Sequence, residues 1–189
     1  MMKVEFSVFE RTLNPSMSVR KISHSIRSVV LSMLQIFIDD FEEKGIVVSL
    51  DAGTASERRL EIDHDSLLVS LFYLLENSLK YCCPRTKYKI IFKDENDSFS
   101  ILFNMISIRI ENYEVKELTN FGYRSDTAKK INTEGQGIGM YRIIKTLKLN
   151  NAELEITPRI NDFTKKRGDI TYEGNEFRIK FNRQKDWFK

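Results

Sequence analysis

Apolar residues recur every three to four positions over three stretches of the chain. Residues 18–44 follow this spacing and predict one long helix that ends at Gly45, because glycine readily takes the left-handed conformation that follows many helices. Residues 63–81 predict a second helix with a wide apolar stripe, and residues 141–149 predict a third, shorter one. Between and after them, short runs of alternating or continuous apolar residues are typical of strands.

The remaining pattern predicts strands, a short helix and loops. Residues 4–8 alternate apolar and polar side chains as a short strand does, and Asn14-Pro15 then breaks the chain. Residues 113–120 predict a short helix, and residues 158–169 a polar, basic loop. Further strands are predicted at residues 46–50, 59–62, 88–93, 99–103, 154–157 and 176–181.

Composition narrows the class of protein. The 189 residues are 41% hydrophobic and 30% charged, which is enough apolar chain for one sizeable core and favours a single domain. The 30 Lys and Arg against 27 Asp and Glu leave a net charge of +3, too small by itself to indicate nucleic-acid binding. No apolar run in the sequence reaches the length of a membrane span, and residues 1–6 lack the apolar core of a signal peptide, so we expect a cytoplasmic protein.

One segment has the composition of a phosphate-binding loop. Gly135, Gln136, Gly137, Ile138, Gly139 and Met140 directly precede the helix predicted at residues 141–149. Glycines two positions apart let the backbone approach a ligand, and the start of a helix presents unpaired N–H groups and a partial positive charge. A tight turn before a helix also uses glycine, so this segment alone leaves phosphate binding and a structural turn open.

A second group of polar residues lies on the helix predicted at residues 63–81. Tyr73, Asn77 and Lys80, spaced four and then three apart, fall on one side of this helix and can reach a common ligand. An amide oxygen is a suitable ligand for Mg²⁺, and an ammonium group suits a phosphate. The alternative is an ordinary solvated face of the helix.

Three segments in this order resemble the motifs of one ATP-binding superfamily. Residues 74–81, Leu-Leu-Glu-Asn-Ser-Leu-Lys-Tyr, are similar to the asparagine box of histidine kinases, and residues 135–140 are similar to their second glycine box. Residues 121–125, Phe-Gly-Tyr-Arg-Ser, resemble the phenylalanine-containing segment that opens the mobile lid over the nucleotide. The superfamily includes histidine kinases, DNA gyrase, MutL and the heat-shock chaperones. The resemblance is closest to the histidine kinases and covers about residues 18–181.

The resemblance implies an α+β fold, the Bergerat ATP-binding fold, in which a two-layer α/β sandwich places helices on a mixed β-sheet. Residues 18–189 are then expected to form the ATP-binding domain and residues 1–17 an N-terminal extension. ATP and magnesium are the implied cofactors, with Asn77 holding the metal. The implied nucleotide-binding residues are Asn77, Lys80, Tyr81 and the glycine segment from Gly135 to Met140.

The resemblance implies a lid that opens at residues 121–125 and whose main segment spans residues 126–134. We expect this segment to be mobile without nucleotide, because it is polar and lacks a continuous apolar face. Arg124, Lys129 and Lys130 are then expected to approach the β- and γ-phosphates when ATP binds.

The chain departs from the family pattern where adenine is recognised. The family has an Asp-x-Gly-x-Gly box after the strand that follows the asparagine box, whereas residues 100–110 contain neither aspartate nor glycine. Asn104 is the nearest polar candidate, since its side-chain carbonyl can accept a hydrogen bond from the adenine amine. A neutral amide makes a weaker bond than a carboxylate, so we expect modest affinity, and whether ATP is bound at all stays open.

A second departure concerns catalysis. The gyrase-like branch has a water-activating glutamate four residues before the magnesium-binding asparagine, but Tyr73 stands four before Asn77. A phenol with a pKa near ~10 is a poor general base at neutral pH, so fast ATP hydrolysis is not expected. Glu76 is interpreted first as a surface or salt-bridging residue and second as a catalytic one.

The cysteines and histidines add no further site. Cys82 and Cys83 are adjacent and have no nearby His or Cys partners in the sequence for a zinc site, so we expect reduced, partly buried thiols. Residues 23–27, Ser-His-Ser-Ile-Arg, faintly resemble a histidine-kinase phosphoacceptor box. Too few residues separate His24 from Asn77 for the usual helical hairpin, so His24 is interpreted as a residue of the leading helix, and His64 as a helix-start residue.

These observations lead to three functional hypotheses. In the first, the chain binds ATP with Mg²⁺ and transfers the γ-phosphate to a protein acceptor on another segment or chain. In the second, ATP binding orders the lid and changes a surface that a protein partner reads, with slow or no turnover. In the third, the fold has lost the nucleotide. The sequence leaves open the acceptor, the input signal and whether the chain forms a homodimer.

Overall fold

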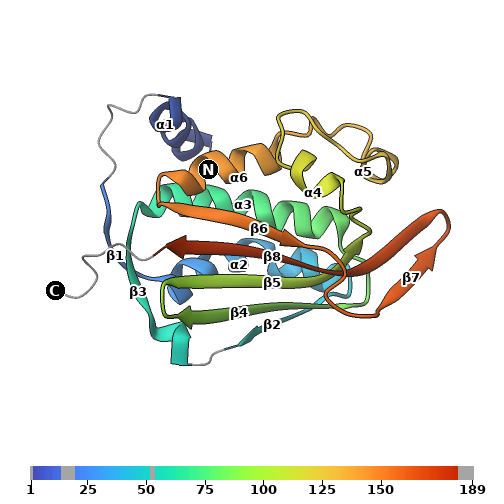
Figure 1. The fold of residues 1–189 in the computed structure, drawn as a ribbon, viewed down its shortest axis with the longest axis horizontal. Helices are drawn as coiled ribbons and strands as arrows, with labels where there is room; N and C mark the ends of the chain where they lie inside the picture. Colours follow the sequence, from blue (N-terminus) through green and yellow to red (C-terminus); the bar gives the residue numbers. More distant parts are fainter. Residues whose placement is uncertain (1, 14–19, 52–53, 183–189) are drawn as a thin grey trace.

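The computed structural model describes residues 2–13, 20–51 and 54–182 (Figure 1). Within these ranges, no helix has both the length and the apolar character needed to cross a membrane. The helices are α1 (Met2–Leu13), α2 (Ile26–Glu43), α3 (His64–Tyr81), α4 (Glu114–Glu117), α5 (Asp126–Ile131) and α6 (Gly139–Lys148), with a 3₁₀ turn at Thr54–Glu57. The strands are β1 (Ile22–Ser25), β2 (Val47–Asp51), β3 (Arg59–Ile62), β4 (Lys87–Glu95), β5 (Ser98–Ile108), β6 (Ala152–Thr157), β7 (Thr164–Arg167) and β8 (Ile170–Asn182).

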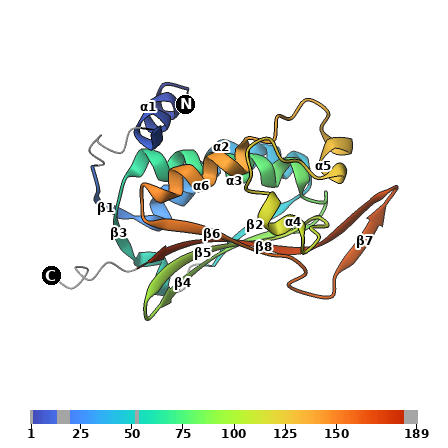
Figure 2. The same ribbon diagram turned by 45° about the horizontal axis from the view of Figure 1, so that its top comes forward.

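The strands form a mixed sheet and a separate two-stranded ribbon. The sheet has the order β2-β4-β5-β8-β6, with β7 paired to the first residues of β8. β2 and β4 are parallel, and the other pairs in the sheet are antiparallel. Helices α2, α3 and α6 lie side by side on one face of the sheet (Figure 2), and the ribbon of β1 and β3 leads into α3. The predicted α+β sandwich of helices on a mixed sheet is therefore confirmed.

Apolar side chains of the helices and the sheet form one core between the two layers. The apolar stripe predicted on α3 is fully buried at Leu67 and Leu71, and it meets Ile143 and Leu147 of α6. Complete burial of one such side chain contributes about 1.5–3 kcal/mol, so this core fixes α3 and α6 against the sheet. The buried aromatic rings of this core on the sheet side are Tyr88, Phe92, Phe99, Phe103 and Phe181.

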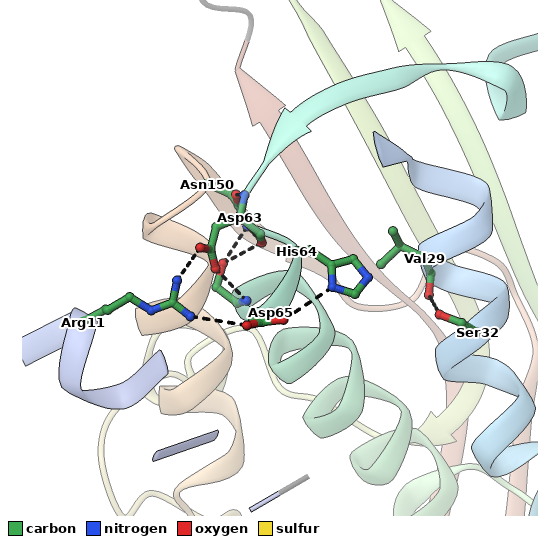
Figure 3. Close-up of polar contacts among 8 residues, drawn as sticks. Arg11, Val29, Ser32, Asp63, His64, Asp65 and Asn150 are labelled. Carbon is green, nitrogen blue, oxygen red and sulfur yellow. Dashed lines mark hydrogen bonds and ion pairs between the residues drawn. The ribbon is translucent and has the colours of Figure 1, made fainter. Parts of the chain in front are cut away.

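Buried polar groups tie α3 to α6. The hydroxyl groups of Ser70 on α3 and Thr146 on α6 lie 2.6 Å apart. At the start of α3, Asn150 accepts from the Asp63 N–H at 2.6 Å and donates to the Asp63 carbonyl at 3.1 Å and to Ser66 Oγ at 2.8 Å (Figure 3). Buried polar groups with satisfied partners favour one packing arrangement. These bonds therefore fix the first half of α3 against the end of α6.

The prediction of a strand at residues 4–8 is wrong, because these residues belong to helix α1. Val8 is fully buried, and the Arg11 guanidinium forms ion pairs with the carboxylates of Asp63 and, at 3.8 Å, of Asp65 (Figure 3). Val8 and Arg11 are three positions apart, so they face the same way on a helix and opposite ways on a strand. Packing of both against the rest of the chain therefore requires the helix. The predicted boundary between residues 17 and 18 lies outside the described residues.

Helix α2 begins at Ile26, not at residue 18 as predicted. Residues 22–25 instead form β1, which pairs with β3, and residues 18 and 19 lie outside the described residues. The Ser25 hydroxyl caps the helix by accepting from the Ser28 N–H at 3.3 Å. The predicted end of α2 is confirmed, since Gly45 follows it in the left-handed region at φ +69°.

His24 lies on β1 rather than on the leading helix. Its ring centroid is 4.8 Å from that of His64, which is the first residue of α3, as predicted. Burial, followed by the nearby His64 and Arg59 side chains, lowers the pKa of His24 below its usual value. The folded chain therefore takes up this proton less readily than the unfolded chain, and the fold loses stability at this position as the pH falls below about 6.5.

Three further differences concern the sheet and the thiols. β5 continues to Ile108, beyond the predicted end at residue 103. The loop predicted at residues 158–169 contains β7, which forms a hairpin with β8 through Gly168 at φ +56° and projects from the body of the sheet (Figure 1). Cys82 and Cys83 are free and buried rather than partly buried, and burial raises the pKa of the Cys82 thiol to about 12.

Candidate functional site

Most of the residues in the sequence motifs line one cavity of about 430 Å³. It is lined by the second half of α3, the start of α6, the end of β5 and the segment that connects β5 to α6. The motif residues on its walls are Glu76, Asn77, Lys80, Tyr81, Arg124, Gly135, Gln136, Gly137, Ile138, Gly139 and Met140. Motifs far apart in the chain therefore face the same space.

Asn77 and Gly139 face each other on the walls of this cavity. A Cβ on Gly139 would lie 3.1 Å from Asn77 Nδ2 and 3.4 Å from Asn77 Oδ1, so the glycine allows the two elements to approach closely. Asn77 Nδ2 is buried and has no hydrogen-bond partner among the described residues. A buried polar group without a partner is costly to a fold and calls for a ligand or ordered solvent. The setting of Asn77 therefore fits a bound polar ligand.

Lys80 and Glu76 form an ion pair of 2.9 Å on the cavity side of α3. Their side chains are 36% and 34% exposed, so water screens the pair and its contribution to stability is small. The interpretation of Glu76 as a salt-bridging residue is confirmed. The pair also holds the Lys80 ammonium group beside the cavity.

The glycine segment is shaped by its contact with the lid. Gly137 has φ +71°, and a Cβ there would come within 2.6 Å of the Gly122 carbonyl carbon and of the Tyr123 carbonyl oxygen. The Gly122 N–H also donates to the Gly137 carbonyl at 3.1 Å. Position 137 therefore requires glycine for a structural reason, independently of any ligand.

Helix α6 begins at the wall of the cavity. Its first residue is Gly139, and the residue before it, Ile138, has no side-chain oxygen to accept from the first N–H groups. Unpaired N–H groups and the helix dipole give this end a partial positive charge. Together with the facing Asn77 amide and the Lys80 ammonium, this end has the chemistry of a phosphate-binding wall.

Asn104 does not line the cavity, so the expectation that it accepts from adenine is wrong. Side chains alternate between the two faces of a strand. On β5, Met105 and Ser107 line the cavity, which places Asn104 on the other face of the sheet. There it lies in register with Lys89 of β4 and Glu176 of β8.

The part of the cavity beside β5 is largely apolar. Met105, Ile108 and Ile110 line it. Ser107 adds a hydroxyl group, which accepts from Asn175 Nδ2 at 2.9 Å. An apolar wall with one hydroxyl beside it suits a heteroaromatic ring better than a charged group.

The lid is held to the rest of the chain more firmly than the sequence predicts. Residues 126–131 form α5, which is capped by the Ser125 hydroxyl. Ala128 is buried, and Ile131 packs with it in a small apolar cluster that contains Cys83 and Tyr172. Ala128 and Ile131 therefore hold this segment through apolar contacts that the sequence did not indicate, and its mobility without nucleotide stays a prediction.

Arg124 lines the cavity and also closes the lid on itself. Its guanidinium donates to the carbonyls of Gly135 at 2.7 Å, of Ala128 at 3.0 Å and of Asn132. These bonds join the two ends of the lid segment. Contact of Arg124 with a phosphate stays a prediction, and it requires the guanidinium to exchange some of these carbonyls for phosphate oxygens.

Lys129 and Lys130 lie outside the cavity. Both side chains are exposed on α5, and Lys129 pairs with Asp126 at 3.0 Å. An approach of either ammonium group to a phosphate therefore requires a movement of α5, and this role stays a prediction.

Replacing Arg124 by alanine is expected to loosen the lid. Hydrogen bonds from a charged donor contribute ~1.5–3 kcal/mol each, so the amides of residues 125–137 should exchange at least ~10-fold faster without them. Hydrogen exchange followed by mass spectrometry measures this effect, and Lys130→Ala, an exposed change on the same helix, is the control. Unchanged exchange in Arg124→Ala would mean that the apolar contacts of α5 hold the lid without the arginine.

Two features of the cavity have no signal in the sequence. Arg142, in the first turn of α6, lines the cavity and donates to the Tyr73 hydroxyl. Glu114 is buried and accepts from the Glu111 N–H at 3.0 Å and from the Tyr123 hydroxyl at 3.1 Å. Burial and then this hydrogen bond raise the pKa of Tyr123 to about 12. From the sequence alone, a single charged residue that lines a cavity cannot be distinguished from one that is exposed to solvent, unless it belongs to a motif.

Solved structures match this fold over most of the chain, whereas no protein-family model and no curated protein matches its sequence. The Acinetobacter baumannii histidine kinase AdeS matches 94% of this chain and 75% of its own, with 13% identity and a TM-score of 0.69. The catalytic domain of histidine kinase ThkA, in a nucleotide-free form, matches 86% of this chain and 97% of its own, with 12% identity and a TM-score of 0.69. Full-length ShkA in complex with AMPPNP matches 94% of this chain and 34% of its own, with 11% identity and a TM-score of 0.68. The chain therefore has the fold of histidine-kinase catalytic domains.

Proposed function

We propose that this chain binds ATP with Mg²⁺ and, as a catalytic domain of the histidine-kinase type, transfers the γ-phosphate to a protein acceptor on another segment or chain. The observation that carries the proposal is the meeting of Asn77 with the glycine segment in one cavity. There Asn77 Nδ2 lacks a partner among the described residues, and Gly139 packs against the amide. The fold supports the proposal, since ShkA, which shares it, forms a complex with AMPPNP.

Each wall of the cavity has a part in this proposal. The Asn77 side-chain oxygen would coordinate Mg²⁺, which when bound supplies positive charge to the phosphates. The N–H groups at the start of α6 and the Lys80 ammonium would hold phosphate oxygens. The apolar wall around Met105 and Ile108 would take the adenine ring, with the Ser107 hydroxyl as a hydrogen-bonding group beside it.

Phosphoryl transfer in such a site depends on positioning and charge more than on a strong base. Tyr73 lies one turn before Asn77 on α3, and its hydroxyl accepts a hydrogen bond from Arg142. A phenol does not activate water at neutral pH. We therefore propose slow hydrolysis and transfer to an acceptor that supplies its own nucleophile.

The same tyrosine favours a second candidate function, a nucleotide-gated interaction module with slow or no turnover. In this function ATP changes the lid and the surface beside it, and a protein partner reads the change. Phe121, at the start of the lid segment, is 72% exposed and offers a partner an apolar contact. Both candidate functions use the same binding residues and differ in turnover.

A titration of the purified chain with ATP and with ADP, each with and without Mg²⁺, tests the binding that both functions require. Magnesium-dependent binding of ATP is the expected result, and no binding at millimolar nucleotide would refute both functions. Incubation with γ-labelled ATP then separates them. Label transferred to a protein supports the kinase, and bound ATP that stays intact supports the module.

A further inference from the structure

Arg142 connects the cavity to the N-terminal helix α1. Its guanidinium carbon lies 5.1 Å from the ring centroid of Tyr73 and 5.5 Å from that of Phe9, and its Nη1 donates to the Tyr73 hydroxyl. Tyr73 and Arg142 line the cavity, whereas Phe9 belongs to α1. One cation is thus in contact with both the cavity wall and a helix outside it.

The position of Arg142 along α3 indicates which part of a nucleotide it would meet. Tyr81, Asn77 and Tyr73 follow one another on α3 at steps of about 6 Å. Tyr81 packs against the cluster that contains Ile108, beside the apolar wall of the cavity. Tyr73 lies about two turns earlier on α3, so Tyr73 and its partner Arg142 lie away from this wall, beyond Asn77. A nucleotide with its adenine on the apolar wall and its metal at Asn77 therefore points its last phosphate towards Arg142.

We propose that Arg142 is a specificity-determining residue that binds the terminal phosphate of ATP and so distinguishes ATP from ADP. This inference rests on the proposed nucleotide site. A guanidinium can donate two parallel hydrogen bonds to one phosphate group, a geometry that a lysine cannot provide. ADP placed in the same way ends one phosphate short of Arg142, so this residue adds affinity for ATP only.

The same residue links the nucleotide to helix α1. α1 is held by the buried Val8 and by the ion pair of Arg11 with Asp63, and Phe9 adds its contact with Arg142. A guanidinium drawn to a phosphate gives up part of its contact with the Phe9 ring, because the two partners compete for one cation. α1 is therefore held more firmly in the ADP-bound chain than in the ATP-bound chain.

The test compares the affinities of the full chain for ATP and for ADP, both with Mg²⁺, by calorimetry in wild type, Arg142→Gln and Lys145→Gln. Wild type should bind ATP at least ~10-fold more tightly than ADP, and Arg142→Gln should bring the two affinities within ~2-fold of each other. Lys145 lies on the same helix over the Tyr141 ring and outside the cavity, so Lys145→Gln should keep the wild-type ratio.

Hydrogen exchange of residues 2–13 tests the link to α1. It should be faster with AMPPNP and Mg²⁺ than with ADP and Mg²⁺ in wild type and Lys145→Gln, and equal in Arg142→Gln. Arg142→Lys keeps the positive charge but lacks the planar guanidinium fork. This variant should fold as wild type does and show a ratio of ATP to ADP affinities between those of wild type and Arg142→Gln. It therefore tests the inference even if Arg142→Gln does not fold.

A wild-type ratio of affinities in a folded Arg142→Gln or Arg142→Lys chain would overturn the inference. So would equal exchange of α1 with both nucleotides in wild type. If Arg142 only packs against α1, Arg142→Gln would instead speed the exchange of residues 2–13 in every nucleotide state and leave the ratio of the ATP and ADP affinities unchanged. A wild-type chain that binds neither nucleotide would refute the proposed function itself, which is a different result from binding both without discrimination by Arg142.

Discussion

Asn77→Ala is expected to weaken magnesium-dependent ATP binding at least ~100-fold, a loss of ~2.7 kcal/mol. The reason is that the amide oxygen is the metal ligand that α3 offers in the proposed site, and alanine offers none. The free chain should keep its stability or gain some, because Asn77 Nδ2 is buried without a partner among the described residues. Calorimetry with ATP and Mg²⁺ measures the first effect, and thermal unfolding without nucleotide measures the second.

Two matched variants separate the metal ligand from its surroundings. Asn77→Asp keeps an oxygen ligand, so it should retain part of the magnesium-dependent binding. Glu76→Gln removes the ion pair with Lys80 but leaves the amide in place, so binding should change less than ~3-fold. Unchanged binding in Asn77→Ala would exclude Asn77 as a metal ligand and remove the main support for the proposed function.

Helices α3 and α6 could be predicted from the sequence because their apolar stripes repeat over several turns. The start of α2 could not, because the apolar positions before Ile26 also fit a helix, and pairing of β1 with β3 outweighed that pattern. Residues 4–8 were too few to distinguish a period of two from one of 3.6. In both segments, contacts with distant parts of the chain decided the local structure.

The candidate site was predictable where its residues form contiguous motifs. Asn77, Lys80 and the glycine segment line one cavity, although their roles in binding stay predictions. Asn104 was placed wrongly because a shift of one residue along a strand reverses the face of the sheet, and the apolar run of β5 gives no alternation to fix it. Arg142 and Glu114 reach the cavity through the packing of helices and the lid, which short-range sequence patterns do not encode.

Gly137→Ala is expected to destabilise the free chain by at least ~2 kcal/mol, which for a chain of this size is a fall in Tm of at least ~4 °C. The backbone at this position is left-handed, with φ +71°, and a Cβ would lie 2.6 Å from backbone atoms of Gly122 and Tyr123. Backbone atoms cannot turn aside as the end of a side chain can, so the lid must move away from α6. ATP binding should fall with it, because the lid forms part of the cavity wall.

Two other glycines separate the causes of this loss when thermal unfolding and ATP binding are measured on all three variants. Gly168 has φ +56° but no atom within 4 Å of a Cβ, so Gly168→Ala reports backbone strain alone. In Gly139→Ala the new Cβ would lie 3.1 Å from Asn77 Nδ2, and the Asn77 side chain can move aside. The affinity for ATP should therefore fall clearly, whereas Tm should change little. Gly137→Ala should lose the most stability. A Gly137→Ala chain as stable as Gly168→Ala would show that contact with the lid does not require glycine at position 137, and phosphate approach would then be the better reason for it.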